Sequence, residues 1–201
     1  MALNFANNNS LSAITTLPAS ISGGAMTLIS EQTASGSANL SFTSGIDDTY
    51  DSYVFKFINC HPSINDTHFQ FNGSTDSGSN YNVTKTTTHF SAVHNEADDA
   101  SSLGYKTGLD LAQSTSFQTL VEEVGADNDQ CLSGYLQLFN PSSTTFVKHF
   151  TARCNNYRRS NYSADHYTAG YGNTTSAVDA IKFQMSSGNI DAGQILLFGV
   201  N

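Results

Sequence analysis

Short runs of alternating apolar and polar residues recur along most of the chain and constrain its fold more than any other feature. Apolar residues at every second position place one face of a strand against a core and the other toward solvent. Turn-forming clusters such as SGID, NGSTDSGSN and NPSS separate the runs. The apolar positions that share a face are Ala38, Leu40 and Phe42; Tyr53, Phe55 and Phe57; Phe69 and Phe71; Tyr81 and Val83; Leu132, Leu136 and Leu138; Phe146 and Phe150; and Ile181, Phe183 and Met185.

A helical period is hard to find. The nearest candidate is SFQTLVEEVGAD, residues 116–127, in which Phe117, Leu120, Val121 and Val124 have helical spacing. This segment is short and is flanked by Thr and Gly, so a strand and a single helical turn fit it equally well.

The chain ends on an apolar run from Ile195 to Val200. Chain ends usually fray, so a run that is apolar on both faces predicts a strand held between neighbours. About ten strands without a helical partner can bury their apolar faces in a sandwich or a closed barrel. We therefore expect an all-β fold, a jelly-roll-like antiparallel β-sandwich over residues 25–201, with the last strand in a central position.

Residues 1–24 show no sustained alternation and are predicted to form an extended N-terminal arm. The arm nevertheless carries more apolar anchors than a free linker needs. It is therefore a candidate docking segment for assembly, and a disordered tail is the alternative. The anchors are Leu3, Phe5, Leu11, Ile14 and Leu17.

Charge argues against one class of partner. Eight Lys and Arg against 17 Asp and Glu give a formal charge of -9, so a nucleic acid would approach against a repulsive field. The N-terminus lacks the basic and apolar regions of a signal peptide, and no apolar stretch reaches the ~18 residues of a membrane span. We expect a soluble protein made in the cytoplasm, without membrane insertion. Cys60, Cys131 and Cys154 are odd in number and widely spaced, so we expect free thiols.

Carboxylates gather in two stretches, HNEADDASS and VEEVGADND. Paired acids can serve acid–base catalysis or bind calcium, and Asp127 and Asp129 match a fragment of a calcium loop. The full loop spacing is absent, so we predict no metal site and keep these two as the sole candidate ligands. The six histidines lack zinc-type spacing, and neither a G-x-S-x-G elbow nor a Gly-rich phosphate loop occurs. We expect neither catalytic residues nor a cofactor.

The stretch CNNYRRSNYSADHYTAGYGN, residues 154–173, is rich in Tyr and Arg. These side chains combine rigid area with a polar tip and are favoured at interfaces. The alternative is an ordinary hairpin whose tyrosines lie over the sheet. The candidate ligand or interface residues are Tyr157, Arg158, Arg159, Tyr162, Tyr167 and Tyr171.

Four phrases resemble a group of tailed-bacteriophage virion structural proteins that is common among marine and cyanobacterial phages. They are FTSGIDDTYDSYVFKFINCHPS, FQFNGSTDSGSNYNVTKTTT, LQLFNPSSTTFVKHF and SSGNIDAGQILLFGV. In that group a G(I)D-Y-x-Y-x-F-x-F strand leads the domain and an S-G-N-I-x-x-G-x-I-x-L-[FY]-G strand closes it. The resemblance covers most of residues 26–200 and carries over no catalytic residue. The matching positions are interpreted as fold determinants: Gly45, Asp47, Tyr50, Phe55, Phe57, Gly188, Ile190, Gly193, Ile195 and Gly199.

The resemblance implies a non-enzymatic component of a phage particle, such as a tail or collar fibre, a head fibre or a capsid decoration protein. Its expected partners are copies of itself, as a trimer or another homo-oligomer, other virion proteins and a host surface glycan. One alternative is a lectin-like module that binds glycans through Tyr157, Tyr162 and Tyr167. Another is a glycan-cleaving enzyme that uses carboxylates such as Glu122 and Asp127.

Overall fold

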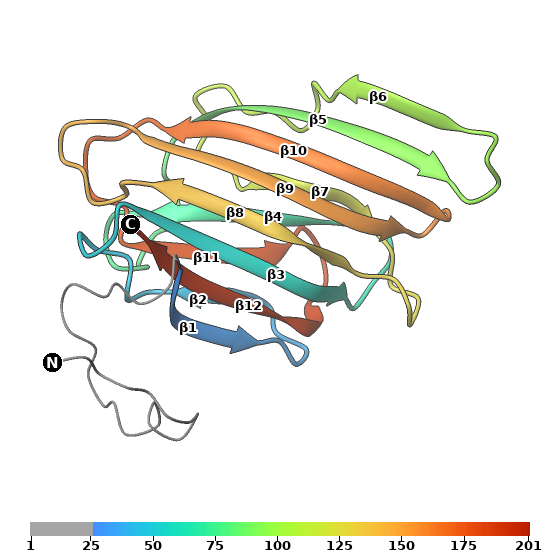
Figure 1. Cartoon of the computed structure of the whole chain (residues 1–201), viewed down its shortest axis with the longest axis horizontal. Coiled ribbons are helices and arrows are strands. Elements are labelled where there is room, and N and C mark those ends of the chain that lie inside the picture. The colour runs from blue at the N-terminus through green and yellow to red at the C-terminus, as the bar shows by residue number, and fades with distance from the viewer. Residues whose placement is uncertain (1–25) are drawn as a thin grey trace, which may run out of the picture.

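A computed structural model describes residues 26–201, and every regular element in that range is a β-strand (Figure 1). The all-β antiparallel prediction is confirmed, whereas the jelly-roll order of strands in particular stays a prediction. The strands are β1 (Thr27–Thr33), β2 (Leu40–Phe42), β3 (Ser52–Pro62), β4 (Thr67–Ser74), β5 (Lys85–Asn95), β6 (Ser101–Tyr105), β7 (Gln118–Val124), β8 (Leu132–Phe139), β9 (Lys148–Arg158), β10 (Tyr162–Gly172), β11 (Ala180–Met185) and β12 (Ile190–Val200).

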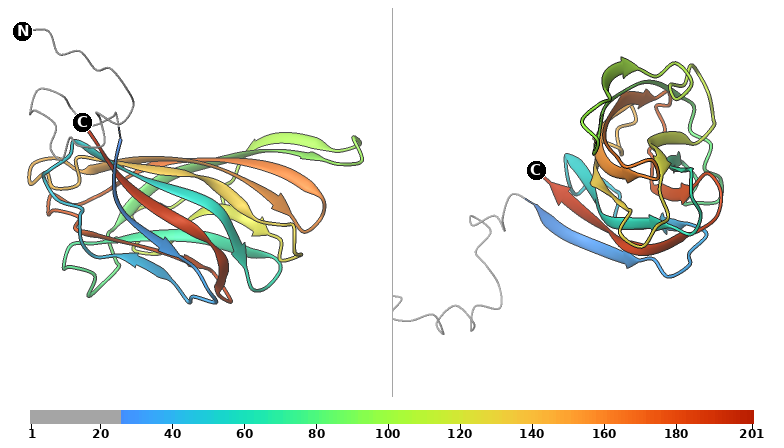
Figure 2. Two further views of the ribbon diagram at one scale, coloured as in Figure 1. Left: turned by 60° about the horizontal axis from the view of Figure 1, so that its bottom comes forward. Right: turned by 90° about the vertical axis from the view of Figure 1, so that its right-hand side faces the viewer.

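The strands form two antiparallel layers that curl round a common interior (Figure 2). The large layer has the order β1-β12-β3-β8-β9-β10-β5-β6, and the small layer has the order β7-β4-β11-β2. One bridge between Val124 of β7 and Arg158 of β9 joins the layers along one side. Consecutive strands pair at β5–β6, β8–β9 and β9–β10, whereas the other neighbours are not consecutive in the sequence.

Phenylalanine rings fill one part of the interior. Phe183 of β11 contacts Phe55 and Phe57 of β3 edge-to-face, with ring centroids 5.2 and 5.1 Å apart, and stacks on Phe69 of β4 at 5.8 Å. Such aromatic contacts add to the free energy gained by burying the rings. All four residues occupy alternating positions that the sequence pattern assigns to the core, and all four are buried.

The last strand is central, as predicted. β12 pairs with β1 on one side and with β3 on the other. Ile195 and Leu197 are fully buried, whereas Leu196 and Phe198 face outward and are partly buried. The strand begins at Ile190 rather than at Ile195, because two β-bulges bring the predicted turn GNIDAG into the sheet.

Glycine is required within this bulged segment. Gly193 has a φ of 111°, and a Cβ at that position would lie 2.6 Å from the carbonyl oxygen of Asn59. Both the backbone conformation and the close approach of β3 exclude a side chain here.

The structure decides one open alternative and differs from the sequence pattern at other positions. The ambiguous segment around Leu120 is the strand β7. Phe146 does not share a strand with Phe150: it lies in a loop whose carbonyls turn toward Lys148 Nζ, and it is 69% exposed. Tyr81 lies outside any strand, because the Asn72 side chain donates to the Tyr81 carbonyl where a strand partner would otherwise bond.

Two of the four phrases on which the resemblance rests, the leading and the closing one, meet in space. Tyr53 Oη lies 2.9 Å from the carbonyl oxygen of Asp47 and accepts a hydrogen bond from the Asp47 amide at 3.0 Å. The ring of Tyr50 covers Gly199, where any Cβ would overlap it. The Tyr50 contact and the pairing of β3 with β12 therefore hold the leading phrase against the closing strand.

The predicted arm, with Leu3, Phe5, Leu11, Ile14 and Leu17, lies outside the described residues. Among residues 26–201 no helix is long and apolar enough to cross a membrane. Cys60, Cys131 and Cys154 are free thiols in the structure.

Candidate functional site

The Tyr- and Arg-rich stretch forms the β9–β10 hairpin, and strand alternation divides its side chains between the two faces of the large layer. Tyr157, Tyr167 and Tyr171 share the outer face, whereas Arg158 and Tyr162 lie on the inner side. The Arg158 guanidinium stands 5.9 Å from the centroid of the Tyr162 ring. The six candidate residues therefore do not form one site.

The two arginines hold the hairpin against the rest of the fold. Arg158 forms an ion pair with Glu123 of β7. Arg159 lies in the turn, with its Nη2 3.3 Å from Asp66 Oδ2 just before β4. Glu123 lies in the small layer, and Asp66 lies just before the first residue of β4. We therefore infer that these two arginines hold the two layers together.

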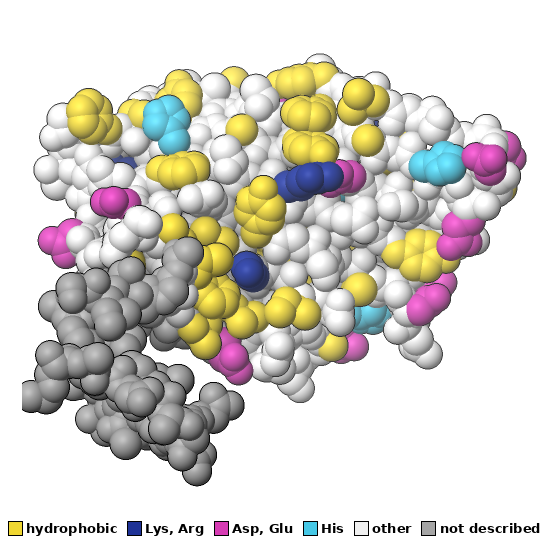
Figure 3. All heavy atoms as spheres, in the orientation of Figure 1, with side chains coloured by type: hydrophobic (Ala, Val, Ile, Leu, Met, Phe, Trp, Pro, Cys, Tyr) yellow, Lys and Arg dark blue, Asp and Glu magenta, His cyan; other side chains and the backbone are white. Residues whose placement is uncertain are grey.

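A row of aromatic and cationic side chains crosses the outer face of the large layer. Cross-strand pairing places its members opposite one another on β6, β5, β10, β9 and β8, and we call them the aromatic row: Tyr105, Phe90, Tyr167, Arg153 and Tyr135. Figure 3 shows the row as hydrophobic side chains interrupted by one dark blue cation. Tyr105, Phe90 and Tyr135 are 52%, 40% and 42% exposed.

Contacts within the row hold its side chains in one arrangement. The rings of Phe90 and Tyr167 are stacked at 4.8 Å, and the Arg153 guanidinium lies 4.9 Å from the Tyr167 ring centroid. Arg153 donates to both carboxylate oxygens of Asp165, and Tyr167 Oη donates to the same carboxylate. Tyr105 Oη donates to Asp110 at 2.7 Å. A partner would therefore meet side chains that have already lost rotamer freedom.

A trough runs beside the aromatic row. Two hollows of about 350 and 300 Å³ adjoin each other across β5, β10 and β9 and share Thr88, Ala169 and Thr151. These three residues are cross-strand neighbours and form the floor. The aromatic row is one wall, and Tyr171 with His149, whose rings lie 6.1 Å apart, forms the other.

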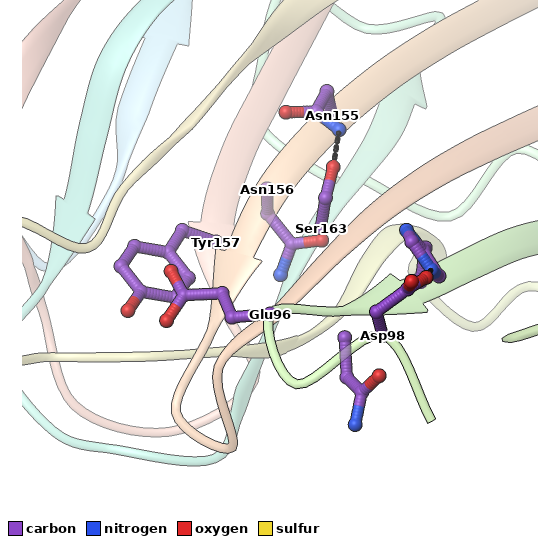
Figure 4. A pocket seen from close by; sticks show the side chains of 8 residues that line it. Glu96, Asp98, Asn155, Asn156, Tyr157 and Ser163 are labelled. Atoms are coloured by element: carbon purple, nitrogen blue, oxygen red, sulfur yellow. Dashed lines mark hydrogen bonds and ion pairs between the residues drawn. The ribbon is translucent and has the colours of Figure 1, made fainter. Parts of the chain in front are cut away.

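A separate acidic hollow of about 430 Å³ lies where the end of β5 meets the β9–β10 hairpin (Figure 4). Glu96, Asp98 and Tyr157 line it, together with Asn155, which donates to Ser163. Desolvation and a hydrogen bond to Glu96 raise the pKa of the Tyr157 hydroxyl. Asp98 is 90% exposed and bonds His94 at 3.0 Å, so water reaches these carboxylates freely.

The second acidic stretch is dispersed by the fold. Glu122 is buried in β7, where its Oε1 lies 3.0 Å from Lys106 Nζ, whereas Asp127 and Asp129 are exposed in the following loop. Desolvation raises the pKa of Glu122, but Lys106 outweighs it and the net pKa is lowered. Among the described residues no group of three or more His, Cys, Asp or Glu side chains could hold a metal ion.

The interior between β5, β10, β9 and β7 is polar and contains a histidine pair that the sequence pattern does not reveal. Thr168 Oγ1 lies 2.9 Å from His89 Nδ1, His89 Nε2 lies 3.3 Å from His166 Nδ1, and His166 Nε2 lies 3.0 Å from Asn156 Oδ1. The Asn156 amide in turn donates to the carbonyl of Glu122. His89 and His166 are 0% and 1% exposed.

One set of tautomers satisfies the whole chain of bonds. Because the Asn156 nitrogen donates to Glu122, its oxygen must accept from His166 Nε2, which leaves His166 Nδ1 to accept from His89 Nε2. Both imidazoles are then neutral. Burial lowers the pKa of His89 and lowers that of His166 to about 3, the second also because of the adjacent His89.

Neither the aromatic row nor the histidine pair follows from sequence spacing. Each needs the register of strands that are far apart in the chain: His89 and His166 are separated by 77 positions. Alternation gives little signal here, because the buried face of β5 is itself polar and contains Lys85, Thr87 and His89.

Comparisons with protein-family models, with curated proteins and with solved structures each found no match.

Proposed function

We propose that this chain is a non-enzymatic structural and attachment component of a tailed-bacteriophage particle, and that the outer face of the large layer is its contact surface. The observation that carries the proposal is the aromatic row. Exposed aromatic and Arg side chains gathered on one face are the composition typical of binding surfaces. The assignment to a phage particle is supported by the resemblance of the leading and closing phrases of the domain to tailed-bacteriophage virion proteins.

The placement of the proton-transferring groups favours binding over catalysis. His89 and His166 are enclosed by the sandwich and bonded to each other, so a substrate cannot reach them. Glu122, the carboxylate considered for glycan cleavage, is buried and held by Lys106, while Asp127 is exposed. The acids of the hollow around Glu96 are exposed to water, whereas a catalytic carboxyl is usually shielded from it.

Immunogold electron microscopy tests the assignment to a particle. Antibodies raised against the full chain should label intact virions of the encoding phage at a constant position, and antibodies pre-absorbed with the protein should not. Recovery of the chain solely in the soluble fraction of a lysate, with unlabelled particles, would overturn the proposal.

A phage carrying Phe90→Ala and Tyr167→Ala tests the contact surface. We expect reduced adsorption to the host or reduced incorporation of the chain into particles. Tyr81→Ala is the matched control, since Tyr81 is an aromatic residue that lies under Lys182 of the small layer. If adsorption and incorporation both stay at the wild-type level, the outer face of the large layer is not the contact surface.

A further inference from the structure

We infer that the trough binds a single polysaccharide chain that lies across strands β5, β10, β9 and β8. The inference rests on the proposed function, because it names the ligand of the same outer face. It is carried by the shape of the trough, by the chemistry of its walls and floor, and by its charge.

The dimensions suit a narrow linear ligand. Tyr167 and Tyr171, on opposite walls, are four residues apart on β10, which is ~13 Å along a strand. The trough crosses from β5 to β8 over three strand spacings, ~14 Å. A stable protein interface needs ~800 Å² from each partner. A channel of this size accommodates a few sugar rings more readily than a folded protein.

The walls and the floor match the two kinds of surface on a sugar ring. A pyranose presents C–H groups on its faces and hydroxyls round its edge. The negative faces of aromatic rings attract C–H groups, and the walls supply Tyr167, Tyr135 and Tyr171. The exposed Thr88 and Thr151 place hydroxyls on the floor, and Arg153 supplies N–H donors at the edge.

Charge favours a neutral or acidic chain. The whole protein has a formal charge of -9, yet no Asp or Glu lines either hollow, and Arg153 does. The carboxylate of Asp165, beside the aromatic row, is already paired with Arg153. Most acidic side chains visible on this face lie near its margins (Figure 3). An acidic polysaccharide would therefore meet less repulsion here than on the surrounding surface.

Affinity electrophoresis and titration calorimetry of the full chain test the inference, with linear glucans, chitohexaose, alginate and hyaluronan as probes. Wild-type protein should bind at least one of them. Tyr167→Ala removes a wall and should weaken binding about tenfold. Thr151→Trp fills the floor, leaves both walls in place and should abolish binding, while Tyr81→Ala should bind like the wild type.

Three results would overturn the inference. The first is that the wild-type chain binds none of these probes. The second is that a probe binds with unchanged affinity to Thr151→Trp and Tyr167→Ala, each shown to be folded by its thermal melt. The third is a wild-type oligomer in light scattering that both variants dissociate, which would make a second copy the occupant. If any of these results is obtained and immunogold microscopy nevertheless labels the virions, the polysaccharide ligand is refuted. The assignment to a phage particle is then unaffected.

Discussion

Buried hydrogen bonds hold the imidazoles of His89 and His166 in their neutral form. The chain of bonds from Thr168 to Asn156 uses each imidazole once as donor and once as acceptor. An added proton would place two N–H groups against each other at the 3.3 Å contact. Burial opposes the same proton, because a charged imidazole would lose its hydration.

Stability should therefore fall in mild acid. The pKa of His166 is lowered to about 3 in the folded state, against an ordinary value of 6.5. Well above pH 6.5 neither the folded nor the unfolded chain binds this proton, so the contribution of neutral His166 to stability is fully present. Below pH 6.5 the unfolded chain takes up a proton that the folded chain refuses until its own pKa is reached. We expect the free energy of unfolding to drop by about 2 kcal/mol between pH 8 and pH 5 from His166 alone.

Urea denaturation at several pH values measures this drop. His166→Gln should be less stable at pH 8 but should lose much of the pH dependence. His149→Gln, which replaces an exposed histidine, should keep it. An unchanged pH dependence in His166→Gln would show that the buried pair does not control acid stability.

Gly199 marks a contact between distant parts of the chain. A Cβ there would overlap the Tyr50 ring, so Gly199→Ala should cost about 1–3 kcal/mol of stability through overpacking. Gly104→Ala in β6 is the matched control, because a Cβ there meets no atom within 4 Å. Thermal or chemical denaturation compares the two, and equal stability of both variants would contradict the tight Tyr50 contact.

β6 is an exposed edge strand, whereas β12 is paired on both sides. β6 pairs with β5 alone, and four of its five residues are exposed. β12 lies between β1 and β3 and buries Ile195 and Leu197. Strand edges with few buried apolar contacts open at low free energy, whereas central strands open near the global free energy of unfolding.

Hydrogen exchange should follow this order. Peptides that cover Ser101–Tyr105 should take up deuterium well before peptides that cover Ile195–Val200. Mass spectrometry of the full chain at neutral pH measures both in one experiment. Slow exchange in β6, equal to that in β12, would indicate that β6 is covered by a partner in solution.

Residues 25–201 should fold without the first 24 residues. Residues 26–201, which the structure describes, contain twelve strands and a core made by Phe55, Phe183 and their neighbours. We expect protein that lacks residues 1–24 to keep a β-type circular dichroism spectrum and a cooperative melt. We also expect it to lose self-association in light scattering, because the apolar anchors Leu3 to Leu17 are removed. Wild-type association in the truncated protein would refute the docking role of the arm.

The Tyr-rich hairpin shows which part of the candidate site cannot be predicted from the sequence. Tyr157, Tyr162 and Tyr167 form a compact group in the sequence, and the lectin hypothesis treats them together. Alternation within β10 separates Tyr162 from Tyr167, since even and odd positions face opposite sides of a strand, and the register of the β9–β10 hairpin places Tyr157 on the same face as Tyr167. Which residues then lie beside Tyr167 depends on two registers. The turn between β9 and β10 sets one, and the pairing of β10 with β5, which is distant in the sequence, sets the other.

Alternation and turn chemistry are local properties, so the sequence alone indicates many of the strands, although not β1, β5 or β6, together with much of the core and the central place of the last strand. The positions of Phe55, Phe69 and Ile195 in the core follow from that pattern. The aromatic row, the trough and the pairing of His89 with His166 depend instead on which strands become neighbours and in what register. Those choices are made when non-local strands pair and bury their common faces, and a local pattern contains no record of them.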